Sequence, residues 1–316
     1  MQKKLDLSVI IPTRNRLKLL KRTINQLSKN RFFFKDIIII DSSDRVLKKD
    51  ILLIKKEFKR IKISIYNSKP SISKQRNIGI AKIKKNRKYI MFLDDDIKFQ
   101  KDSLNEMYKF ILKNSDYAGL GFNLIDKKNT KLDLIKKSVI FKLLGIYSPK
   151  PGYVTKSGWH TKARNLKKNT EVNWLSTQAV IYKKSLIKGK KFDTQYGPYS
   201  YLEDLDFSFA ISSEHHLIII SKAKYYADNT IDRNSINFGF IEILNRYIFI
   251  KKFKLSKICF YIGVFFITIK NISKCYKIKK NNIHQFIGNL KGIFYILFIL
   301  KKDFKLITNK NKWNKF

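Results

Sequence analysis

Short apolar runs alternate with segments of helical spacing along the first hundred residues. Leu7–Ile11 is a β-branched apolar run that ends at Pro12 and predicts a buried strand. Leu17–Leu27 places its apolar residues on one face and predicts a helix. Ile37–Ile40 predicts a second buried strand, which ends at Asp41.

The alternation continues to the middle of the chain. Residues 61–65 alternate as a strand does, Ser71–Ile83 has the pattern of a helix, and Tyr89–Leu93 predicts a fourth strand that ends at Asp94–Asp96. Strands that alternate with helices predict an α/β fold with a mainly parallel central sheet flanked by helices. Such sheets bind ligands outside the carboxyl ends of their strands, so we looked for function there.

The second half of the chain has a different pattern. Residues 148–170 are rich in Pro, Gly, Lys and Asn and predict a long loop, while 172–182 has strand-like patterning. Residues 202–211 predict a helix and 217–220 a further strand. From Phe238 onward the sequence is helical, apolar and rich in lysine, which predicts a C-terminal helical region.

The composition of the chain limits the classes of molecule that it is expected to bind. It has 316 residues, of which 44% are hydrophobic, and this is enough for a buried core. The formal net charge of +43 by itself favours nucleic acid or an anionic membrane as a partner. However, the cations are spread along the chain and comprise 56 Lys against 11 Arg, whereas specific recognition of phosphates and bases favours the arginine fork. We therefore expect no specific nucleic acid partner.

The cysteines and the apolar segments predict a cytoplasmic location. Cys259 and Cys275 lack the spacing of a zinc motif and lie in an apolar helical segment, so no disulfide framework is predicted. Met1–Leu7 is short and charged and has no signal-peptide core. The most apolar stretch, Ile258–Ile269, is about half as long as a membrane-spanning helix.

Three adjacent carboxylates, Asp94, Asp95 and Asp96, follow the predicted strand Tyr89–Leu93. Their mutual repulsion is costly unless a cation or hydrogen-bond donors compensate it. Oxygen-rich clusters suit Mg²⁺ or Mn²⁺, which bridge protein carboxylates to a diphosphate. The alternative is a solvated acidic loop or the charged start of a helix.

Other charged groups follow the predicted strands. Asp41 is placed to accept hydrogen bonds from a base or a ribose, although aspartate also begins ordinary turns. Arg76, early in a helix, is suited to holding a diphosphate or lies on a solvated face. Tyr201–Phe207 contains three acids, which offer a general base or the usual acidic start of a helix.

Five motifs occur in a fixed order along residues 5–230. They are Ser8–Arg16, Ile37–Asp44, Arg76–Gly79, Phe92–Asp96, and the pair Trp174–Ser176 with Leu202–Asp204. Together they resemble the opening strand and nucleotide loop, the second strand, the Arg-Asn-x-Gly element, the acidic metal motif and the acceptor-side motifs of family 2 glycosyltransferases with the GT-A fold. Each match is loose, but the order and spacing of all five are specific.

The resemblance implies an inverting, metal-dependent enzyme. It would transfer a hexosyl or deoxyhexosyl group from a nucleotide-sugar donor to a hydroxyl of a glycan or lipid-linked saccharide, with Mg²⁺ or Mn²⁺ as cofactor. The catalytic domain would span residues 1–235, with a nucleotide-binding half at about 5–125 and an acceptor half at about 126–235. Residues 236–316 would form an amphipathic helical extension.

The resemblance also implies a role for each motif residue. The donor nucleotide would contact Pro12, Thr13, Arg14, Asn15, Asp41, Arg76, Asp94 and Asp95. Within that group, Asp41 would contact the base, and Asp94 or Asp95 the ribose. Asp96 would coordinate the metal. Asp204 would be the catalytic base, with Glu203 supporting the acceptor site.

The chain departs from the family pattern at one expected ligand. Many members carry a metal-linked His after the last sheet strand, but Tyr225–Asn229 contains none. Asp228 is the candidate replacement, because a carboxylate is a competent ligand for a hard cation. Trp174 and His160 are candidate acceptor contacts, and ordinary loop surface is the alternative for His160.

The last 66 residues are strongly basic. Residues 251–316 contain 16 Lys, no Arg and a single acid, Asp303, and their apolar runs at 258–269 and 293–300 alternate with lysine clusters. This pattern is typical of helices that lie on anionic lipid. It also fits helices packed on the protein with lysine stems covering apolar surface, and the sequence leaves both possibilities open.

Two other functions were weighed against glycosyl transfer. A nucleotidyltransferase of related fold would carry a Gly-rich loop after the first strand, where Pro12–Asn15 has no glycine. Dinucleotide-binding and P-loop enzymes are disfavoured because their glycine motifs are missing. A basic, non-catalytic protein that binds membranes or nucleic acid would have no need of the acid cluster.

Overall fold

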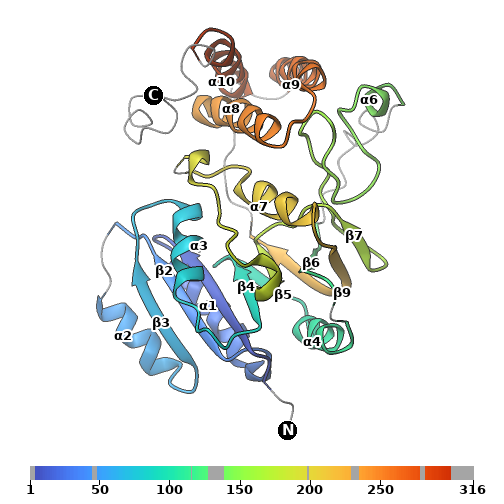
Figure 1. The fold of residues 1–316 in the computed structure, drawn as a ribbon. Helices are drawn as coiled ribbons and strands as arrows, with labels where there is room; N and C mark the ends of the chain where they lie inside the picture. Colours follow the sequence, from blue (N-terminus) through green and yellow to red (C-terminus); the bar gives the residue numbers. More distant parts are fainter. Residues whose placement is uncertain are drawn as a thin grey trace. The chain divides into compact units, whose positions relative to one another are not determined.

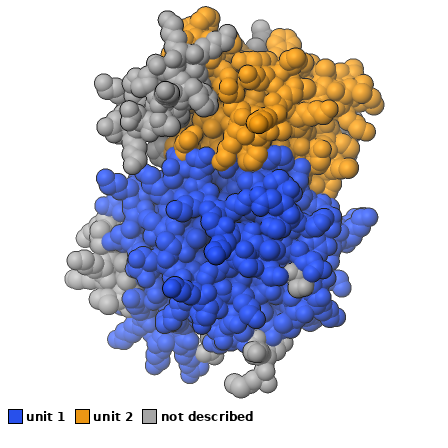
Figure 2. All heavy atoms as spheres, viewed as in Figure 1, with its two compact units in different colours: residues 1–128, 162–194, 198–228 blue, residues 129–161, 195–197, 229–316 orange. Residues whose placement is uncertain are grey.

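Figure 1 shows a computed structural model of the chain, which describes residues 4–44, 48–114, 116–126, 139–197, 199–228, 235–277 and 282–299. The contacts divide the chain into two compact units, coloured separately in Figure 2. Unit 1 comprises residues 1–128, 162–194 and 198–228, and unit 2 comprises residues 129–161, 195–197 and 229–316. The lysine clusters at 301–316 lie outside the described residues. The predicted catalytic boundary at residue 235 stays a prediction.

The first half of unit 1 forms a parallel sheet, as predicted. Its strands lie in the order β3 (Lys62–Asn67), β2 (Asp36–Asp41), β1 (Leu7–Thr13) and β4 (Tyr89–Leu93). The predicted end of β1 at Pro12 is wrong, because the strand continues to Thr13, opposite Asp41. The pairing of β1 with β4 ends at Ile10, so Pro12 lies where β1 has one neighbour and its missing N–H is tolerated.

Beyond β4 the sheet is mixed rather than mainly parallel. The next strands are β8 (Ala179–Lys183), β6 (Gly119–Leu124), β9 (Leu217–Ala227) and β5 (Ile97–Phe99), while β7 (Thr170–Val172) also pairs with β9. The pairs β4–β8, β6–β8, β5–β9 and β7–β9 are antiparallel, and β6–β9 is parallel. Strand β5 follows the acid cluster directly and pairs antiparallel with β9, so the end of β9 lies next to that cluster.

Several elements differ from the sequence prediction. The strand predicted at 172–182 is interrupted, because Trp174–Ser176 lies between β7 and β8 rather than in a strand. Strand β6 was not predicted, because its glycines give no strand signal. A Cβ atom on Gly119 would lie 2.7 Å from a methyl of Leu217, so the packing there requires glycine.

Helices cover both faces of the sheet in Figure 1. The side chains of Val9 and Ile11 pack with α1 (Leu17–Ser28), α2 (Lys48–Glu57) and α4 (Ser103–Lys113). Alternate residues such as Ile10 face α3 (Ile72–Ala81) and α7 (Glu203–Ser212). A Cβ on Gly79 would lie 2.5 Å from Ile10 Cγ2, so α3 lies very close to β1. Short 3₁₀ helices occupy Arg31–Phe33, Lys184–Ile187 and Thr194–Tyr196.

The described residues of unit 2 after Phe238 are mostly helical, as predicted, whereas residues 144–161 of the same unit form turns and loops. Its helices are α6 (Val139–Leu143), α8 (Ile236–Lys252), α9 (Lys257–Lys277) and α10 (Asn282–Phe294), and a π-helical turn follows at Tyr295–Ile299. Among the described residues, no helix has both the length and the apolar character needed to cross a membrane.

Candidate active site

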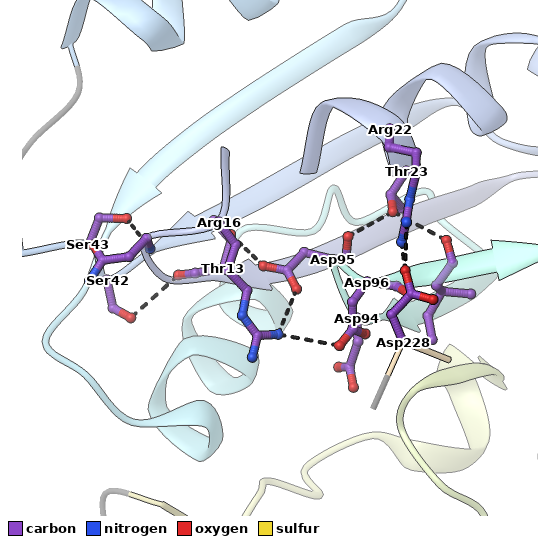
Figure 3. A network of polar contacts seen from close by, with 12 residues as sticks. Thr13, Arg16, Arg22, Thr23, Ser42, Ser43, Asp94, Asp95, Asp96 and Asp228 are labelled. Atoms are coloured by element: carbon purple, nitrogen blue, oxygen red, sulfur yellow. Dashed lines mark hydrogen bonds and ion pairs between the residues drawn. The ribbon is translucent and has the colours of Figure 1, made fainter. Parts of the chain in front are cut away.

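A guanidinium group contacts each of the three aspartates after β4, and Figure 3 shows that Asp95 and Asp96 share Arg16. Asp95 accepts a hydrogen bond from Thr13 Oγ1 at 2.6 Å, and its other oxygen accepts from Arg16 Nη1 at 3.3 Å. Asp96 accepts from the same Arg16 nitrogen at 3.3 Å. Asp94 accepts from Arg76 Nη2 at 2.9 Å. The predicted compensation of the repelling carboxylates therefore comes, in part, from guanidinium groups.

Helix α1 fixes the backbone of this acidic turn. Thr23 Oγ1 donates to the carbonyl of Asp95 at 2.8 Å, and Arg22 Nη2 donates to the carbonyl of Asp96 at 3.0 Å. These bonds hold the two carbonyls toward α1, while the carboxylates of Asp95 and Asp96 contact Arg16 at the start of the same helix. The backbone of the turn is thus held by protein groups alone, which suits a site that must place charges accurately.

Burial raises the pKa of all three aspartates. For Asp94 the pKa rises to about 6, because desolvation and the neighbouring acids outweigh the attraction of Arg76. Desolvation also raises the pKa values of Asp95 and Asp96. Arg16 opposes both shifts, and the hydrogen bond from Thr13 also opposes the shift of Asp95. A bound cation would reverse these shifts, since it stabilises the charged form of each carboxylate.

The structure brings Asp228 to the same place. Pairing of β5 with β9 sets Ile97 opposite Ala227, so the residues just outside the pair, Asp96 and Asp228, are adjacent. The amide nitrogen of Asp228 lies 3.4 Å from the carbonyl oxygen of Asp96. The negative charge of the Asp228 carboxylate helps to raise the pKa of Asp96. The Asp228 carboxylate is half-exposed and accepts from Arg22 Nη1 at 2.6 Å.

A hollow opens at the ends of β1 and β2. Its polar lining comes from Thr13, Arg16, Asp41, Ser43 and Asp50. Asp41 uses Oδ1 to accept from the amide and the hydroxyl of Ser43, at 2.9 and 2.6 Å. Two residues of this lining also belong to the acid cluster, because Thr13 contacts Asp95 and Arg16 contacts both Asp95 and Asp96.

The loop after β1 is tied to the loop after β2. Arg14 Nη2 and Asn15 Nδ2 donate to the two oxygens of Asp44, at 2.9 and 2.7 Å. From helix α3, Gln75 Nε2 donates to the carbonyls of Thr13 at 3.0 Å and Ile40 at 2.8 Å. These hydrogen bonds give a loop without glycine a defined backbone conformation. The two donors to Asp44, Arg14 and Asn15, are both exposed to solvent.

Arg76 joins the acid cluster to α7. It is buried, its Nη1 donates to Glu203 Oε1 at 2.5 Å, and its guanidinium lies 5.5 Å from the ring centre of Phe192. The alternative of a solvated face for Arg76 is therefore wrong. Burial raises the pKa of Glu203 to about 8, with repulsion from Asp204 adding to the shift and Arg76 opposing it.

Asp204 differs from its neighbour in exposure. Glu203 is 8% exposed and faces Arg76, whereas Asp204 is only partly buried at the start of α7. The Oδ1 atom of Asp204 accepts from the amide of Leu205 at 2.8 Å. Its charge acts on Asp94, Glu203 and Arg76, so it belongs to the same cluster. Of the two predicted catalytic acids, Asp204 is the one that a ligand can reach more easily.

The candidate acceptor contacts lie in different units. Trp174, in unit 1, is 7% exposed, so only a small part of its surface is accessible to a ligand. His160, in unit 2, is partly buried in a turn where the amide of Thr155 donates to the carbonyl of Trp159 at 2.7 Å. Acceptor binding by either residue stays a prediction.

Four residues that contact the site were not predicted as site residues, namely Arg16, Arg22, Thr23 and Gln75. Arg16 stands in the opening motif, so its place next to the acid cluster could have been predicted from that motif. Arg22 and its partner Asp228 are 206 residues apart, and no local pattern links them. Gln75 precedes Arg76 in a motif that was quoted, but its contacts depend on α3 packing against β1.

Comparisons with known proteins place these observations in context. A family model described as "Glycosyl transferase family 2" matches residues 8–188. No curated protein matches the chain.

Solved structures similar to the chain include three of low sequence identity. S. aureus TarS 1-349 has a TM-score of 0.55 and 17% identity, over 92% of this chain and 80% of that one. The mannosyltransferase PcManGT from Pyrobaculum calidifontis, solved with GDP-Man and Mn²⁺, has a TM-score of 0.56 and 10% identity, over 92% and 88%. GalNAc-T7 with UDP, GalNAc and Mn²⁺ has a TM-score of 0.54 and 13% identity, over 77% and 48%.

Proposed function

The chain belongs to glycosyl transferase family 2 and is a glycosyltransferase, and from this premise we propose a specific reaction for it. It transfers a hexosyl or deoxyhexosyl group from a nucleotide-sugar to a hydroxyl of a glycan or lipid-linked saccharide, with inversion and with a divalent metal. The likeness to solved structures shows the GT-A fold that the sequence motifs predicted.

One observation carries the proposal. In a chain with a net charge of +43, the described residues bring six carboxylates and three guanidinium groups together at the carboxyl end of β4. The acids are Asp94, Asp95, Asp96, Glu203, Asp204 and Asp228, and the cations are Arg16, Arg22 and Arg76. A local excess of acid that is largely withdrawn from solvent is costly to fold unless a cationic ligand compensates it.

The donor would lie between the hollow and the acid cluster. Asp41 would contact the base, while Thr13 and Arg16 line the hollow and also contact the acid cluster. A structure of TarS 1-349 in complex with UDP-GlcNAc and one of PcManGT with GDP-Man support a nucleotide-sugar as donor class. Since those two donors differ in base and sugar, neither is assigned to this chain.

The residues at the cluster fit a hard divalent cation. Within the described part of the chain, no three His, Cys, Asp or Glu side chains gather as a complete metal site. Asp96 and Asp228 nevertheless present adjacent carboxylates, and Mg²⁺ usually takes only one or two protein carboxylates, completing its shell with phosphate and water. Bound there, Mg²⁺ or Mn²⁺ would neutralise charge on the diphosphate.

The chemical step assigned to this chain is a single displacement. The acceptor oxygen bonds to the anomeric carbon from one side while the bond to the diphosphate oxygen breaks on the other, which inverts the configuration. The acceptor proton passes to Asp204, whose Oδ1 is already held by the amide of Leu205. Arg76 holds Glu203 and Asp94 in place and offsets their charge beside this base.

Thermal denaturation with a panel of nucleoside diphosphates and nucleotide-sugars, with and without Mn²⁺, tests the donor site. A ligand that binds only the folded state raises the melting temperature by mass action. We expect one nucleotide to give a Mn²⁺-dependent rise that Asp96→Asn removes and that the exposed control Glu214→Gln retains. No rise with any nucleotide in the folded wild type would count against a working donor site.

Once a donor and acceptor are identified, the anomeric configuration of the product, read by NMR, tests inversion. Retention of the donor configuration would exclude the single displacement assigned to Asp204.

A further inference from the structure

The helices of unit 2 expose many large apolar side chains. The exposed residues on α10 and its π-helical turn, on α9 and on α6 are Ile283, Leu290, Phe294, Phe298, Ile299, Ile258, Tyr261, Phe265, Ile269, Val139, Ile140 and Leu143. We call these residues the outer apolar face. Single exposed apolar residues are ordinary, but so many on three neighbouring helices need an explanation.

On α10, the exposed side chains lie opposite the packed ones. Gly288 and Gly292 face α8, where a Cβ on Gly288 would lie 2.1 Å from the carbonyl oxygen of Ile236. With 3.6 residues per turn, Leu290 and Phe294 project from the other side of the helix, and they are 45% and 58% exposed. The two helices are thus packed as tightly as backbones allow, and α10 still has a second apolar face.

Helix α9 repeats this arrangement. Its packed side carries Phe260, Val264 and Gly263, and a Cβ on Gly263 would lie 2.6 Å from the ring of Trp159. Its other side carries a stripe with spacings of three and four residues, formed by Ile258, Tyr261, Phe265 and Ile269. A helix that is apolar on both sides calls for a second apolar environment.

Helix α6 lies next to α9 and extends the face. The rings of Phe141 and Phe266 meet edge to face with their centres 4.9 Å apart. This contact uses the one aromatic side chain of α6 and leaves Ile140 and Leu143 outward, at 65% and 80% exposed. With Val139, three of the four apolar side chains in this short helix are therefore mostly exposed and add little to the packing of unit 2.

The charges around the face have one sign. In the described part of unit 2 the single acid is Glu242, which is buried and accepts from Gln285 Nε2 at 2.9 Å. The exposed cations on these helices and their ends are Lys142, Lys251, Lys252, Lys254, Lys257 and Lys291. A second copy of this chain would bring the same positive charge to the contact, so self-association is opposed electrostatically.

We propose that the outer apolar face binds an anionic phospholipid surface, with α9 and α10 lying in the plane of the interface. Phe265, Phe294 and their neighbours would enter the acyl boundary, and the lysines would reach the headgroup phosphates. Only the outer sides of the helices are available to lipid, because their inner sides are packed. This inference does not depend on the donor or the reaction proposed above.

Co-sedimentation with vesicles tests the proposal without any substrate. We expect the full chain to bind vesicles of equal parts phosphatidylglycerol and phosphatidylcholine, and to bind phosphatidylcholine alone at least about tenfold more weakly. The double variant Ile258→Ser, Phe265→Ser should lose about tenfold or more in partition to anionic vesicles. The double variant Lys254→Gln, Lys257→Gln should lose about fivefold per lysine, mainly at low salt.

The matched control is Leu112→Ser, which removes an equally exposed apolar side chain from α4 in unit 1 and should bind as the wild type does. If the serine variants do not fold, Phe265→Trp replaces them, and brominated lipid should quench its added fluorescence. Failure of the folded wild type to bind anionic vesicles overturns the proposal. So does a result in which the α9 serine variant dissociates a lipid-free dimer but binds vesicles unchanged.

Discussion

Arg76 Nη1 donates to Glu203 Oε1 at 2.5 Å, joining α3 to the first turn of α7 across 127 residues of sequence. Both side chains are nearly inaccessible, with 3% and 11% of their surface exposed. The second guanidinium nitrogen holds Asp94, so one buried cation connects the acid cluster with the helix that carries the candidate base. The contact is part of the architecture of the site as well as of its electrostatics.

Removing the cation should therefore be costly. Arg76→Met should lower the free energy of unfolding by about 3–5 kcal/mol, because it leaves two buried carboxylates without their partner. Glu203→Gln should cost less, since the amide oxygen can still accept from Arg76. Urea unfolding of the two variants checks this order, and an Arg76→Met variant as stable as the wild type would show that the cluster does not need the cation.

Stability should fall as pH rises because of Glu203. Its pKa is raised from 4.5 to about 8 by burial, so between those values the folded state holds a proton that the unfolded state has lost. The contribution is present in full below pH 4.5 and is lost as pH rises through about 8, with a slope of at most about 1.4 kcal/mol per pH unit for one proton.

Urea unfolding of the wild type and of Glu203→Gln across this range measures that contribution as a difference. The variant should become more stable relative to the wild type as pH rises, and Glu214→Gln, an exposed acid, should show no such trend. Parallel curves for wild type and Glu203→Gln would mean that the carboxyl titrates normally.

Asp228 should contribute to metal binding. Asp228→Ala should weaken Mn²⁺ binding in the presence of nucleoside diphosphate by at least about tenfold, whereas Asp228→His, which supplies an imidazole ligand, should restore much of it. Titration calorimetry measures both affinities. An unchanged Mn²⁺ affinity in Asp228→Ala would assign Asp228 only to its ion pair with Arg22, and Arg22→Met is the variant that removes that pair separately.

Asp204 should affect turnover rather than donor binding. Asp204→Asn keeps the shape of the side chain but cannot take the acceptor proton, so kcat should fall by about 10²–10⁴ while the Kd of the donor stays within about twofold. Donor hydrolysis or transfer to an identified acceptor, followed at fixed pH, provides the rate. A variant with nearly full kcat would transfer the role of base to another group.

The sequence by itself determined the first half of the fold and the positions of its chemistry. Buried runs such as Leu7–Ile11 are too apolar and too short for anything but interior strands, and their alternation with helices dictates a parallel arrangement. Acids at strand ends are local features, so Asp41 and Asp94–Asp96 could be identified without coordinates. The motifs around Arg76 and Asp204 depend on short spacings in the same way.

Only the tertiary structure decided how these groups meet. Arg76 looked like a surface residue because its partners are distant in sequence, and burial of an arginine cannot be deduced without them. Gly119–Leu124 gave no signal because its strand is specified by close packing against Leu217 rather than by its own propensity. The pairing of Arg22 with Asp228 follows from the return of β9 to β5. Long-range pairing of this kind is set by the free energy of the whole sheet, which no local pattern of residues records.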